Sequence, residues 1–264
     1  MCPARDGTAV HGYLVLPPGR PARDLPVIVY PHGGPHWRDV WEMGRFREIQ
    51  LLANRGYAVL QVNFRGSTGY GKSYLTAGFK QNGLAVQNDL TDGVRHLISE
   101  GIADPSRIAI IGGSYGGYAV LAGLAFTPEL YACGVSLFGV SSFFTFLEAL
   151  AQWTDMSVHY ERIGHPIRDR ELLTRTSPLL HVENIRVPIL IAQGGRDPIV
   201  NPEESDQMVA ALREQNVPVE YIYHAEEGHG YFSRHDNWLD LWRAIEAFLA
   251  EHLDATASKT AFGG

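Results

Sequence analysis

The sequence predicts an α/β protein built on a mostly parallel central sheet, with helices on both faces of that sheet. Short apolar, β-branched segments alternate with amphipathic segments along most of the 264 residues. This alternation is typical of parallel sheets, because each crossover helix covers one face of the sheet. The hydrophobic fraction of 45% suffices for a large core, and the length fits a single domain over residues 1–264.

The expected elements follow from hydrophobic periodicity and from turn residues. The strand-like segments are Ala9–Leu16, Pro26–Tyr30, Tyr57–Phe64, Arg107–Ile111, Gly134–Phe138, Val187–Ala192 and Val219–Tyr223. The helix-like segments are Trp41–Asn54, Val86–Ser99, Tyr118–Phe126, Pro202–Gln215 and Asn237–His252. Because the first strands precede any helix, we expect them to form an antiparallel edge.

Residues 141–181 interrupt this alternation with aromatic side chains, a proline and a charged helical piece. We expect a short helical insertion here, beside the carboxyl edge of the sheet, where α/β folds bind ligands. The last residues, 254–264, are small and polar, which predicts a frayed end.

The composition excludes several classes of function. The formal charge of −7, without any clustered basic residues, argues against a nucleic-acid partner. The chain contains no run of about 18 apolar residues, and its first residues lack the apolar stretch of a signal peptide. We therefore expect no membrane partner and a cytoplasmic location. Cys2 and Cys133 are expected to be free thiols, and oligomerisation leaves no signature in the sequence.

The chemistry is indicated first by the segment at residues 107–121, which reads as a strand, a glycine turn and a helix. It contains Gly112-Gly-Ser114-Tyr-Gly116, the Gly-x-Ser-x-Gly pattern of a nucleophile elbow in the required context. The tight turn forces the serine into a strained conformation that exposes its hydroxyl above the sheet. The glycines are needed because the strand and the helix approach closely. Ser114 is thus the expected nucleophile of an α/β-hydrolase fold.

A serine hydroxyl needs a general base that is oriented by an acid. In the α/β-hydrolase fold these residues follow the serine in the order acid, then histidine. Asp197 lies on the loop after the strand Val187–Ala192, and His229 lies between two glycines after the strand Val219–Tyr223. We expect the two to act with Ser114 as a catalytic triad.

Other residues compete for these roles. His224 sits at a strand end, too early to reach over the sheet, and His235 begins the last helix, where a solvated or capping role is commoner. Asp206 is a more distant alternative to Asp197, because it lies within a helix.

The oxyanion hole needs two N–H donors. One is expected from Tyr115, directly after the nucleophile, and the other from the glycine turn at Gly33 or Gly34, after an early strand. His32 and His36 superficially resemble a metal pair, but neither a carboxylate nor a cysteine completes the set. We expect neither a metal nor a cofactor.

The best alternative from another class is a nucleotide-binding site. Residues 66–73, Gly-Ser-Thr-Gly-Tyr-Gly-Lys-Ser, fit the phosphate-loop pattern and follow the strand Tyr57–Phe64. A phosphate loop leads directly into a helix, whereas residues 74–78 read as irregular. No strand ends directly in the aspartate that would help to hold magnesium.

Five motifs together resemble the catalytic domain of the prolyl oligopeptidase family, and most closely its acylaminoacyl-peptidase-like branch. The resemblance extends over about Ala4 to Leu253. The motifs are Pro31-His-Gly-Gly-Pro35, Asn63-Phe-Arg-Gly-Ser-Thr-Gly-Tyr-Gly71, Gly112-Gly-Ser-Tyr-Gly-Gly117, Gln193-Gly-Gly-Arg-Asp197 and Glu227-Gly-His229-Gly.

This resemblance implies a serine peptidase that acts on short peptides or acylated N-termini, often with esterase activity. It implies Gly34 as the second oxyanion donor, and it assigns residues 66–73 to a family pattern rather than to a phosphate site. The candidate pocket residues are Arg65, Phe143, Phe144, Phe146, Trp153 and Val200.

Two departures from the family pattern affect the expected substrate. The chain starts where the hydrolase domain would start, so the N-terminal β-propeller of the family is expected to be absent. Ile199 stands where many relatives have an arginine that contacts a substrate carbonyl. We therefore expect hydrolysis of small acyl esters or short acyl-peptides. A true oligopeptidase or acylaminoacyl peptidase is the alternative, and an inactive fragment is a third.

Overall fold

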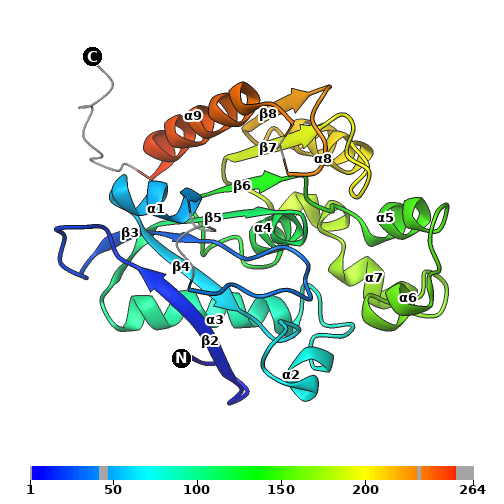
Figure 1. Cartoon of the computed structure of the whole chain (residues 1–264), viewed down its shortest axis with the longest axis horizontal. Coiled ribbons are helices and arrows are strands. Elements are labelled where there is room, and N and C mark those ends of the chain that lie inside the picture. Colours follow the sequence, from blue (N-terminus) through cyan, green and yellow to red (C-terminus); the bar gives the residue numbers. More distant parts are fainter. Residues whose placement is uncertain (1, 42–46, 231–232, 254–264) are drawn as a thin grey trace.

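The computed structural model describes residues 2–41, 47–230 and 233–253, and these residues fold around one eight-stranded sheet (Figure 1). The strand order is β1-β2-β4-β3-β5-β6-β7-β8. The strands are β1 (Cys2–Pro3), β2 (Ala9–Val15), β3 (Leu25–Val29), β4 (Ala58–Asn63), β5 (Ala103–Gly113), β6 (Cys133–Leu137), β7 (Ile189–Gly194) and β8 (Val219–His224). The predicted α/β-hydrolase architecture is confirmed.

β1 and β2 form the antiparallel edge, and the remaining strands run parallel from β4 to β8. The prediction that all the strands before the first helix lie at this edge is wrong for β3, which pairs in parallel with both β4 and β5. All five residues of β3 are buried. Strands that are buried on both faces read as continuous apolar runs, which is typical of central parallel strands.

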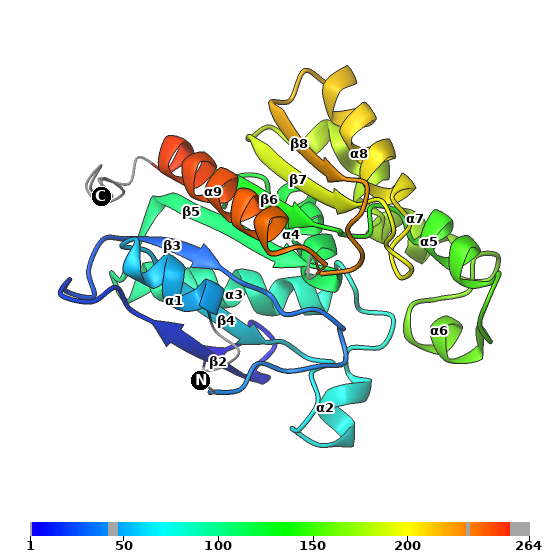
Figure 2. The same cartoon turned by 45° about the horizontal axis from the view of Figure 1, so that its top comes forward.

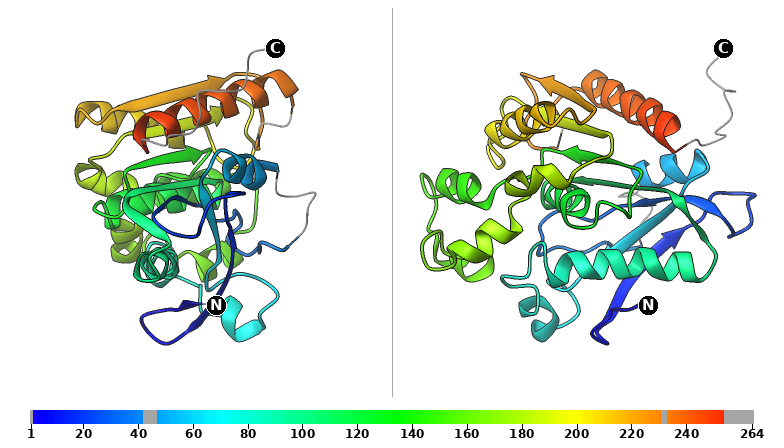
Figure 3. Two further views of the ribbon diagram at one scale, coloured as in Figure 1. Left: turned by 90° about the vertical axis from the view of Figure 1, so that its left-hand side faces the viewer. Right: turned by 180° about the vertical axis from the view of Figure 1, so that it is seen from behind.

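Helices cover both faces of the sheet. They are α1 (Arg47–Asn54), α2 (Lys72–Thr76), α3 (Ala85–Ser99), α4 (Tyr115–Phe126), α5 (Phe143–Leu150), α6 (Ser157–Arg162), α7 (Arg170–Thr176), a 3₁₀ stretch (Pro178–Asn184), α8 (Glu203–Glu214) and α9 (His235–His252). The views in Figure 2 and Figure 3 place α1 and α9 on one face and α3, α4 and α8 on the other.

Two buried clusters correspond to these two faces. Side chains alternate along each strand, so Val27 and Val29 pack with α3 and α4, whereas Ile28 packs with α1 and α9. The apolar spacing predicted for the last helix is confirmed, since Trp242 and Ile245 are buried in the second cluster.

Most predicted bounds shift by a few residues, and three predictions differ further from the structure. Of the expected helix Trp41–Asn54, the structure describes Arg47–Asn54 as helical; Trp41 is not helical, and residues 42–46 lie outside the described residues. Cys2, at an end with no expected structure, belongs to β1. Residues 74–78 were expected to be irregular, but residues 74–76 belong to the short helix α2. Residues 254–264, which were predicted to form a frayed end, lie outside the described residues.

The insertion predicted at residues 141–181 contains α5, α6 and α7. In Figure 1 these helices extend to one side of the molecule, beyond the ends of the parallel strands. They therefore border the edge of the sheet at which ligand sites form in α/β folds. Among the described residues, no helix is both long and apolar enough to cross a membrane.

Candidate active site

Ser114 occupies the sharp turn between β5 and α4. Its backbone angles are φ 58° and ψ −121°, values that are strained for a residue with a side chain. A Cβ atom on Gly112 would lie 2.6 Å from the carbonyl carbon of Gly116, and one on Gly116 would collide with the carbonyl oxygen of Pro31. Only glycine at both positions allows the strand, the helix and the loop to approach this closely. The turn therefore has the geometry that a nucleophile elbow requires.

α4 begins directly after this serine and is buried from Tyr115 to Ala125. A helix that is apolar all round needs such a buried position. Its first N–H groups have no partner within the helix and carry a partial positive charge. The N-terminus of α4 can thus stabilise a negative charge that develops beside Ser114.

Asp197 lies on the loop that follows β7, and its side chain is fully buried. One carboxylate oxygen, Oδ1, accepts hydrogen bonds from the backbone N–H groups of Ile199 and Val200 at 2.8 and 2.9 Å. The other, Oδ2, lies 2.7 Å from Nδ1 of His229. The backbone donors leave the carboxylate only one orientation, with Oδ2 toward the imidazole.

His229 lies on the loop after β8, and its ring meets Phe138 edge-on, with 4.7 Å between centroids. When Nδ1–H donates to Asp197, Nε2 is left as the proton acceptor. β5, β6, β7 and β8 are parallel neighbours, so the loops after their carboxyl ends share one rim of the sheet. The structure thus joins Asp197 to His229 on the same rim as Ser114.

The glycine loop after β3 passes against the elbow. A Cβ atom on Gly33 would lie 3.6 Å from Cβ of Ser114. Gly34 has a φ of 122°, which favours glycine. Gly34, Ser114 and Tyr115 line one cavity, so the two predicted oxyanion donors lie on the same cavity as the nucleophile.

This cavity has a volume of about 310 Å³. Four of the predicted pocket residues line it: Phe143, Phe146, Trp153 and Val200. Sequence reasoning missed several further lining residues, which come from the α2–α3 connection, α4, the loop after β6 and the insertion. These are Asn82, Tyr118, Val140, Leu150, His159, Arg162 and Ile163. No motif contains them, and only the expectation of an insertion beside the sheet edge pointed to this region.

Two predicted pocket residues are not among those that line the cavity. Arg65 is held in a buried ion pair with Asp89, with N–O distances of 2.6 and 2.9 Å, and it contacts Asp6 at 2.7 Å. These two carboxylates bind the guanidinium of Arg65, which does not line the cavity. Phe144 lies under the guanidinium of Arg170, which is 5.7 Å from the ring centroid.

The competing residues have other partners. His235 stacks on Trp238 at 6.2 Å, and Asp206 accepts a hydrogen bond from the hydroxyl of Tyr221 at 2.6 Å. His32 lies 2.9 Å from the hydroxyl of Ser67. Within the described ranges, no group of three or more potential ligands could hold a metal ion.

The loop with the phosphate-loop pattern uses its N–H groups internally. Gly66 donates to the carbonyl of Tyr74 at 2.9 Å, and Thr68 donates to the carbonyl of Trp37 at 2.8 Å. A phosphate loop instead points successive N–H groups at the anion. A short helix does follow this loop, contrary to expectation, but the N–H groups of Gly66 and Thr68 are already bonded.

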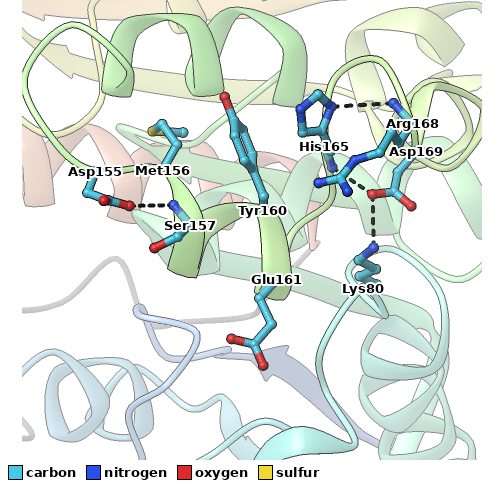
Figure 4. Close-up of a pocket in the computed structure, with 9 residues that line it drawn as sticks. All are labelled: Lys80, Asp155, Met156, Ser157, Tyr160, Glu161, His165, Arg168 and Asp169. Atoms are coloured by element: carbon cyan, nitrogen blue, oxygen red, sulfur yellow. Dashed lines mark hydrogen bonds and ion pairs between the residues drawn. The ribbon is translucent and has the colours of Figure 1, made fainter.

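A second cavity, of about 770 Å³, lies between the insertion and the loop that contains Lys80 (Figure 4). Two of its acidic side chains are paired within it: Asp169 with Lys80 at 2.9 Å, and Asp155 with the backbone N–H of Ser157 at 2.7 Å. It has the larger volume but does not include Ser114, so we assign the chemistry to the smaller cavity.

The fold and the turn at Ser114 are those of the α/β-hydrolase class. The chain belongs to the prolyl oligopeptidase family, whose model matches residues 43–256.

The relatives of this chain include a dipeptidyl aminopeptidase and an acylamino-acid-releasing enzyme. The chain is 41% identical to dipeptidyl aminopeptidase BIII of Pseudoxanthomonas mexicana, over 96% of this chain and 38% of that protein. It is 28% identical to the human acylamino-acid-releasing enzyme, over 82% of this chain and 30% of that protein.

Solved structures agree with these sequence relatives. A puromycin hydrolase superposes with a TM-score of 0.87 at 30% identity, over 100% of this chain and 40% of that one. A puromycin-hydrolyzing peptidase of Mycobacterium tuberculosis gives 0.85 at 31%, over 96% and 39%. The chain thus spans about two-fifths or less of the length of these relatives.

Proposed function

We propose that this chain hydrolyses ester and acyl-peptide bonds through a covalent acyl-enzyme on Ser114. The observation that carries the proposal is the 2.7 Å contact between Asp197 and His229, on the rim that also bears the strained serine. A base oriented by a buried acid is what a serine hydroxyl requires to become nucleophilic.

We further propose that residues 1–264 form a single domain.

In the proposed reaction, Nε2 of His229 accepts the proton of Ser114 as the hydroxyl attacks the acyl carbon. Asp197 stabilises the imidazolium that forms and keeps Nδ1 protonated. The N–H groups of Tyr115 and Gly34 stabilise the oxyanion, and the partial charge at the start of α4 adds to this. His229 then protonates the leaving group, and water releases the acyl group in the reverse sequence.

The proposed substrates follow from the cavity. A volume of about 310 Å³ with aromatic and aliphatic walls suits a small apolar acyl group or one apolar side chain. We therefore propose esterase activity on small acyl esters, together with cleavage of short acyl-peptides. The alternative of a full oligopeptidase or acylaminoacyl peptidase is favoured by the names of the relatives.

The test is the turnover of p-nitrophenyl butyrate by the wild type and by Ser114→Ala. We expect the variant to lose several orders of magnitude in kcat, because a triad acts as a unit. Retained turnover in the variant would remove Ser114 from the mechanism. Comparison of nitrophenyl esters with acyl-peptide anilides then separates the esterase from the peptidase, and no turnover of either would favour an inactive fragment.

A further inference from the structure

The cavity beside Ser114 is lined by basic side chains and by no acidic one among the described residues. Its apolar walls include Phe143 and Phe146, and its ionisable side chains other than tyrosine are His36, His159 and Arg162. None of the described residues that line it is an aspartate or a glutamate. An apolar cavity with only basic groups favours ligands that bring their own oxygen acceptor.

Arg162 is the permanent cation of this cavity. It is the last residue of α6, is half-buried, and its guanidinium lies 5.7 Å from the ring centroid of Phe79. Within the described ranges, no carboxylate lies within ion-pair distance of it. A partly desolvated cation without a partner is costly, so an incoming oxygen acceptor would gain from binding there.

The two histidines contribute little positive charge to the cavity. Burial lowers the pKa of His159, and the charge of Arg162 lowers it further. Burial likewise lowers the pKa of His36, and Arg162 contributes, although the hydrogen bond to Gly66 opposes the shift. Both rings are therefore mainly neutral at neutral pH, and Arg162 provides the charge.

We propose that Arg162 binds a carbonyl or carboxylate oxygen on the acyl part of the substrate. This inference rests on the proposed function of Ser114 and names the side chain that distinguishes acyl groups carrying such an oxygen from purely apolar ones. The apolar side chain enters the aromatic part of the cavity, and the N-acyl oxygen meets the guanidinium. The planar fork of an arginine suits one or two such oxygens.

The experiment uses three p-nitrophenyl esters whose acyl groups all carry the same phenyl side chain and differ in the oxygen acceptors beside it. The acyl groups are 3-phenylpropionyl, which has no amide, N-acetylphenylalanyl, which adds a neutral carbonyl, and N-succinylphenylalanyl, which adds a carboxylate as well. kcat/KM is measured for the wild type, Arg162→Met and Arg168→Met. Arg168 is the matched control, because it lines the other cavity (Figure 4).

We expect Arg162→Met to lower the ratio of kcat/KM for the N-acetyl ester over the phenylpropionyl ester about tenfold or more, as for a lost hydrogen bond to a charged group. If the same ratio for the N-succinyl ester falls further than that for the N-acetyl ester, a carboxylate is the preferred acceptor. If the two ratios fall equally, the acceptor is the amide carbonyl. Arg168→Met should leave both ratios unchanged.

Unchanged ratios in Arg162→Met, or equal losses in Arg168→Met, would overturn the inference. If Arg162→Met does not fold, Arg162→Gln tests the same ratio. Turnover that persists in Ser114→Ala, or no turnover of any ester by the wild type, would instead overturn the proposed function, and this inference with it.

Discussion

Replacing the buried Glu227 by glutamine should lower kcat while leaving KM almost unchanged. The Glu227 carboxylate accepts hydrogen bonds from the backbone N–H groups of Ser233 and Arg234, each at 3.0 Å, and from the side chain of Asn237 at 2.8 Å. These bonds tie the loop that contains His229 to the start of α9. Glu227 therefore holds the imidazole without contacting substrate.

The backbone of Glu227 ties the same loop to the acid. Its carbonyl accepts a hydrogen bond from the N–H of Arg196 at 2.8 Å, one residue before Asp197. A Cβ atom on Gly194 would lie 2.5 Å from this carbonyl. The loops of the acid and the base are thus packed backbone to backbone at Glu227, and a shift of one displaces the other.

The size of the effect follows from these bonds. Glutamine keeps the shape but loses the charge and one acceptor, so one or two charge-assisted bonds are lost, each worth about 1.5–3 kcal/mol. We expect the free energy of unfolding to fall by about 2–4 kcal/mol. A displacement of the imidazole on the order of 1 Å would lower kcat roughly a hundredfold.

The pH dependence of stability provides a second readout. Burial alone would raise the pKa of Glu227, but the hydrogen bonds from Asn237, Ser233 and Arg234 outweigh burial and lower it. A carboxyl group whose pKa is lower in the folded state stabilises the protein above its unfolded pKa, and this stabilisation is lost as pH falls through the folded pKa. The wild type should therefore lose stability in acid more steeply than Glu227→Gln.

The assay combines ester kinetics with urea unfolding at several pH values. Glu226→Gln is the matched control, because Glu226 is exposed and forms a surface ion pair with Arg196 at 2.6 Å. Exposed ion pairs contribute little to the free energy of unfolding, so we expect Glu226→Gln to have near-wild-type kinetics and stability. Equal kcat values for the two variants, or a loss confined to KM, would refute a positioning role for Glu227.

Three further outcomes are expected. Asp197→Asn should lower kcat by about 10⁴ while the fold is retained, because the amide no longer holds His229 in the required tautomer; ester kinetics with circular dichroism check this, and a loss below tenfold contradicts it. Gly116→Ala should lower the free energy of unfolding by about 2 kcal/mol or more, because the new methyl group would collide with Pro31; an unchanged urea midpoint contradicts it. Burial lowers the pKa of His32 to about 4, so the wild type should lose stability as pH falls from about 6.5 to 4, where only the unfolded chain gains a proton; urea unfolding of His32→Gln should show a flatter profile, and parallel profiles contradict the assignment.

Local patterns predicted the parts of the molecule that depend on local geometry. The strand, the glycine turn and the helix around Ser114 follow from steric limits that only glycine satisfies. The order of Asp197 and His229 follows from parallel strands whose ends share a rim. The 2.7 Å contact between these two residues agrees with that reasoning, and their catalytic roles remain predictions.

Long-range partners could not be predicted in the same way. Arg65 was predicted as a pocket residue, but it pairs with Asp89, 24 residues away in the sequence, and with Asp6, 59 residues away. Phe143 and Phe144 are adjacent on one helix, so only one of them lines the cavity. Asn82 and Arg162 reach the cavity from segments without any motif.

The most direct measurement is covalent labelling with a fluorophosphonate, followed by peptide mass spectrometry. A hydroxyl activated by its neighbours should form a single adduct, on the peptide that contains residue 114, and His229→Ala should label far more slowly. A folded wild-type protein that stays unlabelled, or that labels on another serine, would contradict the proposed triad.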